Sequence, residues 1–199
     1  MILSVCGTQR NVGVTYFCLA LSNYLCNMEQ RQVAYLEVNA TGEISAISGK
    51  SALQPGKTNF SHKGIHFYPQ VTLDKLWELL GLSYDFFVLD FGTLSPLSFR
   101  EYVKADYYFI VGHCTPWKLV YYHNFFQKYK HNWEPEKTIC LEALGTKKSI
   151  CKPSDQLPFH VRQIPFLEDP FYLASQDWEF YQELVKSIIP RNHFTIRKL

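Results

Sequence analysis

The feature that most constrains the fold is an apolar run that leads into a glycine-containing loop and then into a helical stretch. Residues 2–6 are mostly apolar, the loop spans residues 7–15, and residues 16–26 carry apolar side chains at helical spacing. A strand, a loop and a helix in this order gather backbone N–H groups at the start of the helix, and such groups favour a bound anion. The stretch therefore predicts a phosphate-binding loop between the first strand and the first helix.

The alternation of strand and helix continues along the chain. Further strands are predicted over residues 32–38, 65–68, 86–89, 107–112, 138–141 and 161–164, and further helices over residues 73–80, 117–129 and 169–189. Thr72 is the expected N-cap of the second helix, and Pro170 is expected in the first turn of the last one. Residues 40–61 and 91–98 are expected to be loops, apart from a short helix near residues 44–47. This order predicts an α/β fold, a three-layer sandwich with a mostly parallel central sheet, in a single domain over residues 1–199.

Polar residues stand where three of the predicted strands end. Gly13 and Thr15 follow the first strand, Glu37 and Asn39 end the second, and Asp90 ends the fourth. Ligands of parallel sheets bind at the carboxyl ends of the strands, so these residues are candidates for one site.

The same stretches carry a family resemblance. The ParA/MinD group of P-loop ATPases has a deviant loop of the form Lys-Gly-Gly-Val-Gly-Lys-Thr, and Gln9-Arg10-Asn11-Val12-Gly13-Val14-Thr15 stands in its place. The group's Leu-Ile-Asp-x-Asp is replaced by Tyr35-Leu36-Glu37-Val38-Asn39, and its Tyr-Asp-x-x-x-x-Asp is matched by Tyr84-Asp85 and Asp90. The order and spacing of these motifs, over most of the chain, resemble those of the P-loop ATPases. The resemblance implies a P-loop NTPase-like fold whose motifs are degenerate.

The resemblance implies a set of site residues. Those expected at a nucleotide are Gly7, Thr8, Gln9, Arg10, Asn11, Val12, Gly13, Val14 and Thr15. Thr15 would ligate Mg²⁺ and Asp90 would hold its water shell. The implied ligand is ATP or ADP with Mg²⁺. The alternative is a loop that only caps the first helix and binds no ligand, with Asp90 as a plain strand-end residue.

The departures from the family bear on catalysis. Val14 stands at the position of the lysine that spans the transferred phosphates, and Gln9 stands at that of the signature lysine. Asn39 cannot accept a proton from an attacking water. We therefore expect a pseudo-ATPase without catalytic residues, a regulatory or localisation module similar to the TadZ/CpaE proteins. A protein partner and a homodimer are expected, with no nucleic acid. The basic tail, residues 191–198, is a weaker candidate for contact with anionic lipid.

A second resemblance gives a different function class. Gly7-Thr8-x-x-x-Val12-Gly13-x-Thr15 is similar to the loop of dethiobiotin synthetases, which share the fold. An ATP-dependent ligase or synthetase of that type is thus the alternative function. Those enzymes need the same lysine, so Val14 favours the regulatory module.

Composition and charge narrow the classes of protein to which the chain can belong. A net charge of +2 gives no strong steering toward nucleic acid, and a hydrophobic content of 47% excludes a disordered chain. No two of the six cysteines have Cys-x-x-Cys spacing, and Cys6, Cys18 and Cys140 are expected to be buried thiols. With no recognisable secretion signal or membrane-spanning run, a cytoplasmic location is expected. Aromatic residues between Trp117 and Tyr129 are expected to serve the core and, in part, a protein-binding face.

Overall fold

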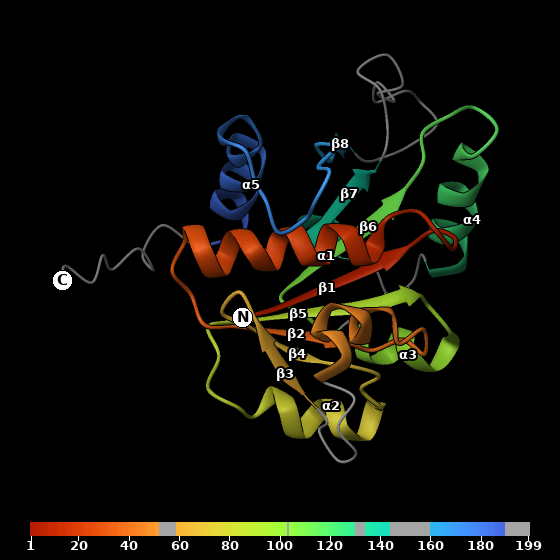
Figure 1. Cartoon of the computed structure of the whole chain (residues 1–199). Coiled ribbons are helices and arrows are strands. Elements are labelled where there is room, and N and C mark those ends of the chain that lie inside the picture. The colour runs from red at the N-terminus through yellow and green to blue at the C-terminus, as the bar shows by residue number, and fades with distance from the viewer. Residues whose placement is uncertain (52–58, 103, 130–133, 144–159, 190–199) are drawn as a thin grey trace.

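An eight-stranded sheet forms the centre of the chain (Figure 1). The computed structural model describes residues 1–51, 59–102, 104–129, 134–143 and 160–189. The strand order is β3-β4-β2-β5-β1-β6-β7-β8. Every neighbouring pair is parallel except β3 and β4, which are antiparallel at one edge. The predicted three-layer α/β sandwich with a mostly parallel sheet is thereby confirmed.

The strands follow the apolar runs of the sequence. Their bounds are β1 (Ile2–Gly7), β2 (Val33–Glu37), β3 (Phe60–His62), β4 (Ile65–Tyr68), β5 (Phe86–Thr93), β6 (Tyr107–Gly112), β7 (Thr138–Glu142) and β8 (Val161–Gln163). The central strand β1 lies between β5 and β6, and its Leu3 and Val5 are completely buried. The chain passes from β1 to β2 on one side and later adds β6 on the other, so the loop after β1 lies where the strand order reverses, the usual place of a ligand.

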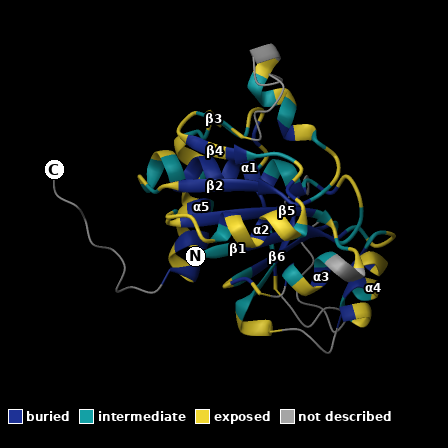
Figure 2. Cartoon of the chain, turned by 90° about the horizontal axis from the view of Figure 1, so that it is seen from below, coloured by how far each residue is buried: buried dark blue, intermediate teal, exposed yellow. Residues whose placement is uncertain are grey.

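The helices cover both faces of the sheet (Figure 1). They are α1 (Val14–Asn23), which continues into a π-helical turn (Tyr24–Met28), α2 (Leu73–Leu80), α3 (Pro96–Tyr102), α4 (Leu119–Tyr129) and α5 (Ser175–Ile188), with 3₁₀ turns at Glu43–Ser51 and Pro135–Lys137. One buried cluster packs α1 and α5 on one face, and a second packs α2, α3 and α4 on the other. Figure 2 shows the strands buried between helices whose outer surfaces are exposed.

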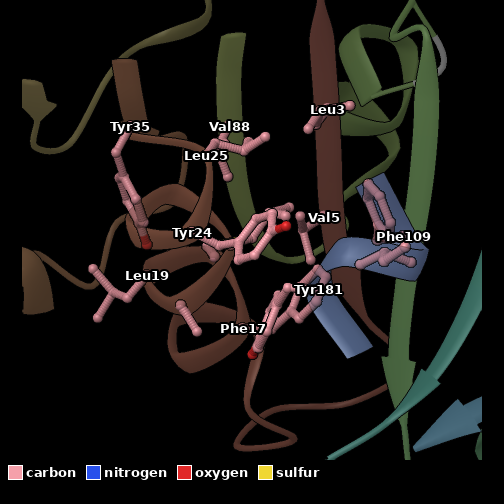
Figure 3. Close-up of a cluster of buried hydrophobic side chains, with 14 of the residues drawn as sticks. Leu3, Val5, Phe17, Leu19, Tyr24, Leu25, Tyr35, Val88, Phe109 and Tyr181 are labelled. Atoms are coloured by element: carbon pink, nitrogen blue, oxygen red, sulfur yellow. The ribbon is translucent and has the colours of Figure 1, made fainter. Parts of the chain in front are cut away.

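Aromatic packing fixes the position of α1 (Figure 3). The ring of Phe17 lies 5.4 Å from that of Phe109 on β6, and Tyr24 stacks on Tyr181 of α5 with ring centroids 5.9 Å apart. All four side chains are almost completely buried. Because α1 is held flat on the sheet by these rings, its first turn is fixed at the carboxyl end of β1.

Most predicted elements lie within one or two residues of the observed ones, and four expectations need correction. The strand expected over residues 86–89 continues through Asp90 to Thr93, because Glu37 of β2 and Gly7 of β1 still pair with it there. The expected loop at residues 91–98 therefore holds a strand end and the start of α3. The expected loop at 40–61 contains β3, since Phe60 stacks on Phe67 of β4.

The last helix begins later than the pattern predicted. It starts at Ser175 rather than at residue 169, so Pro170 lies in a turn before the helix and not in its first turn. The Asp169 side chain accepts a hydrogen bond from Phe171 N there, which stabilises the turn. By contrast, the N-cap is confirmed, because the Thr72 hydroxyl accepts a hydrogen bond from Lys75 N. Cys6, Cys18 and Cys140 are buried, as expected.

Candidate functional site

The loop after β1 combines a left-handed backbone with close packing. Asn11 and Gly13 both have positive φ, of 57° and 93°. A Cβ atom added to Gly13 would lie 2.9 Å from that of Ala143, next to the end of β7, so only glycine fits here without a shift. Thr8 N donates to Val111 O of β6 at 2.9 Å, which ties the loop to a second strand. The loop is therefore a fixed turn that directs the chain into α1.

The first turn of α1 leaves its positive end available to an anion. Gly13 precedes the helix without a side-chain cap, and no acidic residue lies in the first turn. Unpaired N–H groups and the helix dipole favour negative charge at this point. Arg10 is exposed on the loop, and Gln9 is half-buried. The geometry thus fits a phosphate group, with one cation, Arg10, in the loop sequence to accompany it.

Val14 does not face the solvent in the manner of a phosphate-binding lysine. Its side chain is 7% exposed and belongs to the buried cluster under α1, together with Val12 and Phe17. The position therefore contributes to the core and supplies no charge to the loop.

Asp90 is the centre of the polar contacts at this edge of the sheet. It is completely buried and accepts from groups on three parts of the chain. Its Oδ2 accepts from the Thr15 hydroxyl and from the Tyr35 hydroxyl, each at 2.7 Å. Its Oδ1 accepts from Asn39 Nδ2 at 3.1 Å and from Gly92 N at 2.9 Å. A buried carboxylate needs such partners, and here four donors provide them.

The donor roles around Asp90 follow from the neighbouring contacts. Asn39 Oδ1 accepts from Thr41 N at 3.0 Å, so its amide must turn its Nδ2 toward Asp90. Burial and the Asp90 carboxylate raise the pKa of Tyr35 well above its usual value, so its hydroxyl keeps its proton and donates it. Gly92 reaches Asp90 because its φ of 55° bends the end of β5 back.

Two further buried carboxyl groups lie at the same edge. Glu37, which pairs with Asp90 across β2 and β5, accepts from the Thr41 hydroxyl and from Gln70 N, each at 3.1 Å. Glu142, at the end of β7, accepts from Cys114 N at 3.0 Å. Burial raises the pKa of both groups, against the opposing effect of their donors. Burial thus favours the neutral form of both carboxyl groups at the edge of the sheet.

A tyrosine joins the start of α1 to the segment after β8. The Tyr16 hydroxyl donates to Leu167 O at 3.0 Å and accepts from Leu167 N. Burial raises the pKa of Tyr16, so this hydroxyl also remains protonated. The segment after β8 is thereby fixed beside the first turn of α1.

The residues present fit a phosphate group better than a magnesium ion. Thr15 Oγ1 gives its proton to Asp90 and keeps lone pairs for a ligand. Asp90, however, already accepts four hydrogen bonds, about as many as a carboxylate can take, so it has no free position for a metal-bound water. The described residues contain no cluster of three or more His, Cys, Asp or Glu side chains that could hold a metal ion.

The sequence predicted part of this site. Thr15, Asn39 and Asp90 are brought together as expected, and Glu37 lies next to them. Tyr35, Tyr16 and Glu142 were not predicted. Glu142 directly follows a predicted strand, so the rule that drew attention to Asp90 would also have found it. Tyr35 gave no such signal, because a tyrosine within an apolar strand usually serves the core.

Within the described ranges, no helix is sufficiently long and apolar to cross the membrane. A cavity of about 420 Å³ lies away from the loop, between the end of the first helix and the segment before α5, and is lined by Asn23, Asn27, Met28, Lys63, Phe171, Tyr172 and Leu173.

Comparison with known proteins shows similarity in structure and little in sequence. No family model and no curated protein matches the chain. A plasmid partition protein from Borrelia burgdorferi bound to AMPPNP has a TM-score of 0.65 at 13% identity, over 94% of this chain and 98% of that one. The MinC:MinD cell division protein complex of Aquifex aeolicus gives 0.69 at 13% identity, over 95% and 97%.

A synthase has the same fold. Cobyrinic acid a,c-diamide synthase from Mycobacterium smegmatis, with bound ADP and magnesium, gives a TM-score of 0.65 at 14% identity, over 93% of this chain and 94% of that one. At these identities the similarity shows the fold alone: this chain has a ParA/MinD-like P-loop ATPase fold.

The Asp90 contacts predict a specific loss of stability. In Asp90→Asn one accepting oxygen becomes an NH₂ group, and it must face two donors whichever way the amide turns. We expect the free energy of unfolding in urea to fall by about 1–3 kcal/mol. The matched control is Asp106→Asn, because within the described part of the chain Asp106 accepts one hydrogen bond, from Ile2 N at 2.7 Å, which an amide oxygen can keep. An equal or larger loss in the control would contradict the central role of Asp90.

The buried Glu142 predicts a pH dependence. Burial raises its pKa above the ordinary 4.5, so the folded protein binds this proton more tightly than the unfolded chain does. The charged form therefore lowers stability above the raised pKa, and this loss disappears as the pH falls toward 4.5. Glu142→Gln should be more stable than the wild type at pH 7, and the difference should shrink in urea unfolding at pH 6 and pH 5. The exposed Glu179→Gln is the control, and a difference that does not change with pH would refute the assignment.

Proposed function

We propose that the protein is a regulatory or localisation module that acts through protein contacts in the cytoplasm and does not hydrolyse ATP. The observation that carries this proposal is Val14, which is buried in the core at the position of the phosphate-binding lysine.

Phosphoryl transfer depends on positive charge at the transferred group. The charge that develops there is stabilised by several kcal/mol through well-placed cations and donors. The loop sequence contains one cation, Arg10, which is exposed, and neutral groups at Gln9 and Val14. Asn39 is held by Thr41 and Asp90 and has no basic group to activate a water. These features support loss of turnover, while the loop backbone still suits a bound phosphate.

The ligands of similar structures support nucleotide binding as part of the proposal. The Borrelia burgdorferi protein was bound to AMPPNP, and the Mycobacterium smegmatis enzyme to ADP and magnesium. In this chain a nucleotide would stabilise the loop as a static ligand. A ligase or synthetase activity, the other class considered, would need the charge that Val14 lacks.

A protein-binding role is supported by exposed apolar and aromatic residues around the start of α4. Trp117, in the turn before α4, is 74% exposed, and Val120 and Tyr121, in its first turn, are 48% and 42% exposed; we call these three residues the α4 surface. Tyr122, Phe125 and Tyr129 on the same helix are buried and hold it on the sheet. Exposed aromatic residues of this kind dominate the energy of many interfaces. The MinD of Aquifex aeolicus in complex with MinC supports a partner protein, and a homodimer is part of the proposal.

Negligible ATP turnover is the first expected result. Steady-state phosphate release with Mg²⁺-ATP should be at least about 10²-fold below that of a P-loop ATPase that has its lysine, given the energy of one missing electrostatic contact. The wild type and Thr15→Ala should give the same background. Turnover at the ordinary level that Thr15→Ala abolishes would show that another cation replaces the lysine.

The second expected result is self-association through the α4 surface. Light scattering over a concentration series should show a dimer whose mass does not change when Mg²⁺-ADP is added. Trp117→Ala should weaken it by about tenfold or more, the scale of an aromatic anchor. Tyr172→Ala, also on an exposed aromatic residue (73%), is the control and should leave the dimer unchanged. A monomer at all concentrations would reject the homodimer, and an equal effect of both variants would reject the α4 surface.

A further inference from the structure

The carboxylate of Asp90 has no acceptor position left for a ligand. Thr15 and Tyr35 share Oδ2, and Asn39 and Gly92 share Oδ1. The two oxygens of a carboxylate offer about four lone-pair positions in total. A Mg²⁺ ion keeps several waters, and these need nearby acceptors. Asp90 could serve one of them only if a protein donor moved away.

Two of the four donors come from positions where the chain departs from the motif that it resembles. Tyr35 stands in place of a leucine and Asn39 in place of an aspartate. A leucine has no polar group, and an ionised aspartate cannot donate a hydrogen bond. With a leucine and an aspartate at these two positions, Asp90 would accept hydrogen bonds from Thr15 and Gly92 alone among its four present donors. With Tyr35 and Asn39 it accepts all four.

Both donors are held in place by contacts of their own. Tyr35 is completely buried, and its ring lies 5.2 Å from that of Phe67 on β4. Figure 3 shows Tyr35 among the side chains that pack under α1. Asn39 is oriented by Thr41, whose backbone N–H donates to its Oδ1 at 3.0 Å. Moving Tyr35 away would leave its buried hydroxyl without a partner, which is unfavourable.

We propose that Tyr35 and Asn39 are positioning residues that close Asp90 to a divalent cation, and that the loop consequently takes the phosphate of a nucleotide without Mg²⁺. This inference rests on the proposed function and concerns the same site. The phosphate is held by the N-terminus of α1, the loop backbone and Arg10. Asp90 instead joins α1, β2 and the end of β5 through its hydrogen bonds. Metal-dependent cycling of a nucleotide is then absent from this protein.

The test is the metal dependence of ADP binding by the full chain. Calorimetric titration with ADP in Mg²⁺ and in EDTA should give dissociation constants that agree within about twofold, and Mn²⁺ alone should show no bound fraction by electron paramagnetic resonance. Tyr35→Phe frees a position on Oδ2, the oxygen that also accepts from Thr15. In that variant ADP should bind about tenfold more tightly with Mg²⁺ than with EDTA. Tyr181→Phe, which removes a buried hydroxyl without a partner among the described residues, is the control and should match the wild type.

The outcomes separate this inference from the proposed function. Tighter ADP binding with Mg²⁺ in the wild type, or Mn²⁺ bound by it, would overturn the inference. So would a Tyr35→Phe variant that remains insensitive to the metal. If ADP does not bind in either condition, the inference is also wrong. The role in protein contacts would then still stand or fall by light scattering, and the lack of hydrolysis by phosphate release.

Discussion

The burial of one carboxylate organises the edge of the sheet where the candidate site lies. Asp90 is completely buried, so each of its oxygens requires donors from the protein. Those donors come from the loop-helix junction, from β2 and from the turn after it, and from the end of β5 itself. Satisfying Asp90 therefore fixes three segments relative to one another, and with them the start of α1.

The same arrangement limits the chemistry that the site can do. A carboxylate that holds four protein donors is a structural group and has little capacity left for a water or a metal ion. The buried Val14 adds apolar packing at the start of α1 and supplies no charge to the loop. The loop retains its left-handed turn at Gly13 and the free end of a helix, which are the parts of such a site that depend on the backbone.

The comparisons fit this separation between fold and chemistry. A plasmid partition protein, a cell division protein and cobyrinic acid a,c-diamide synthase share the fold of this chain at 13–14% identity. A layered α/β fold requires apolar strands, amphipathic helices and a few turns, and many sequences meet these conditions. Function depends on individual side chains placed on that fold, so a shared fold at this identity leaves the function open.

The sequence by itself determined the fold class and most of the element order. Apolar runs at strand length and helical spacing specify a parallel sheet with covered faces, and the motif order placed Thr15, Asn39 and Asp90 at one edge. Only the tertiary structure showed that Tyr35 reaches Asp90 and that β3 adds an antiparallel edge, because both depend on contacts between distant residues. It also showed that β5 continues past Asp90, since pairing with two neighbouring strands extends a strand beyond its apolar run. A side chain's local pattern tells whether it is buried, but its hydrogen-bond partner is decided by which strands become neighbours.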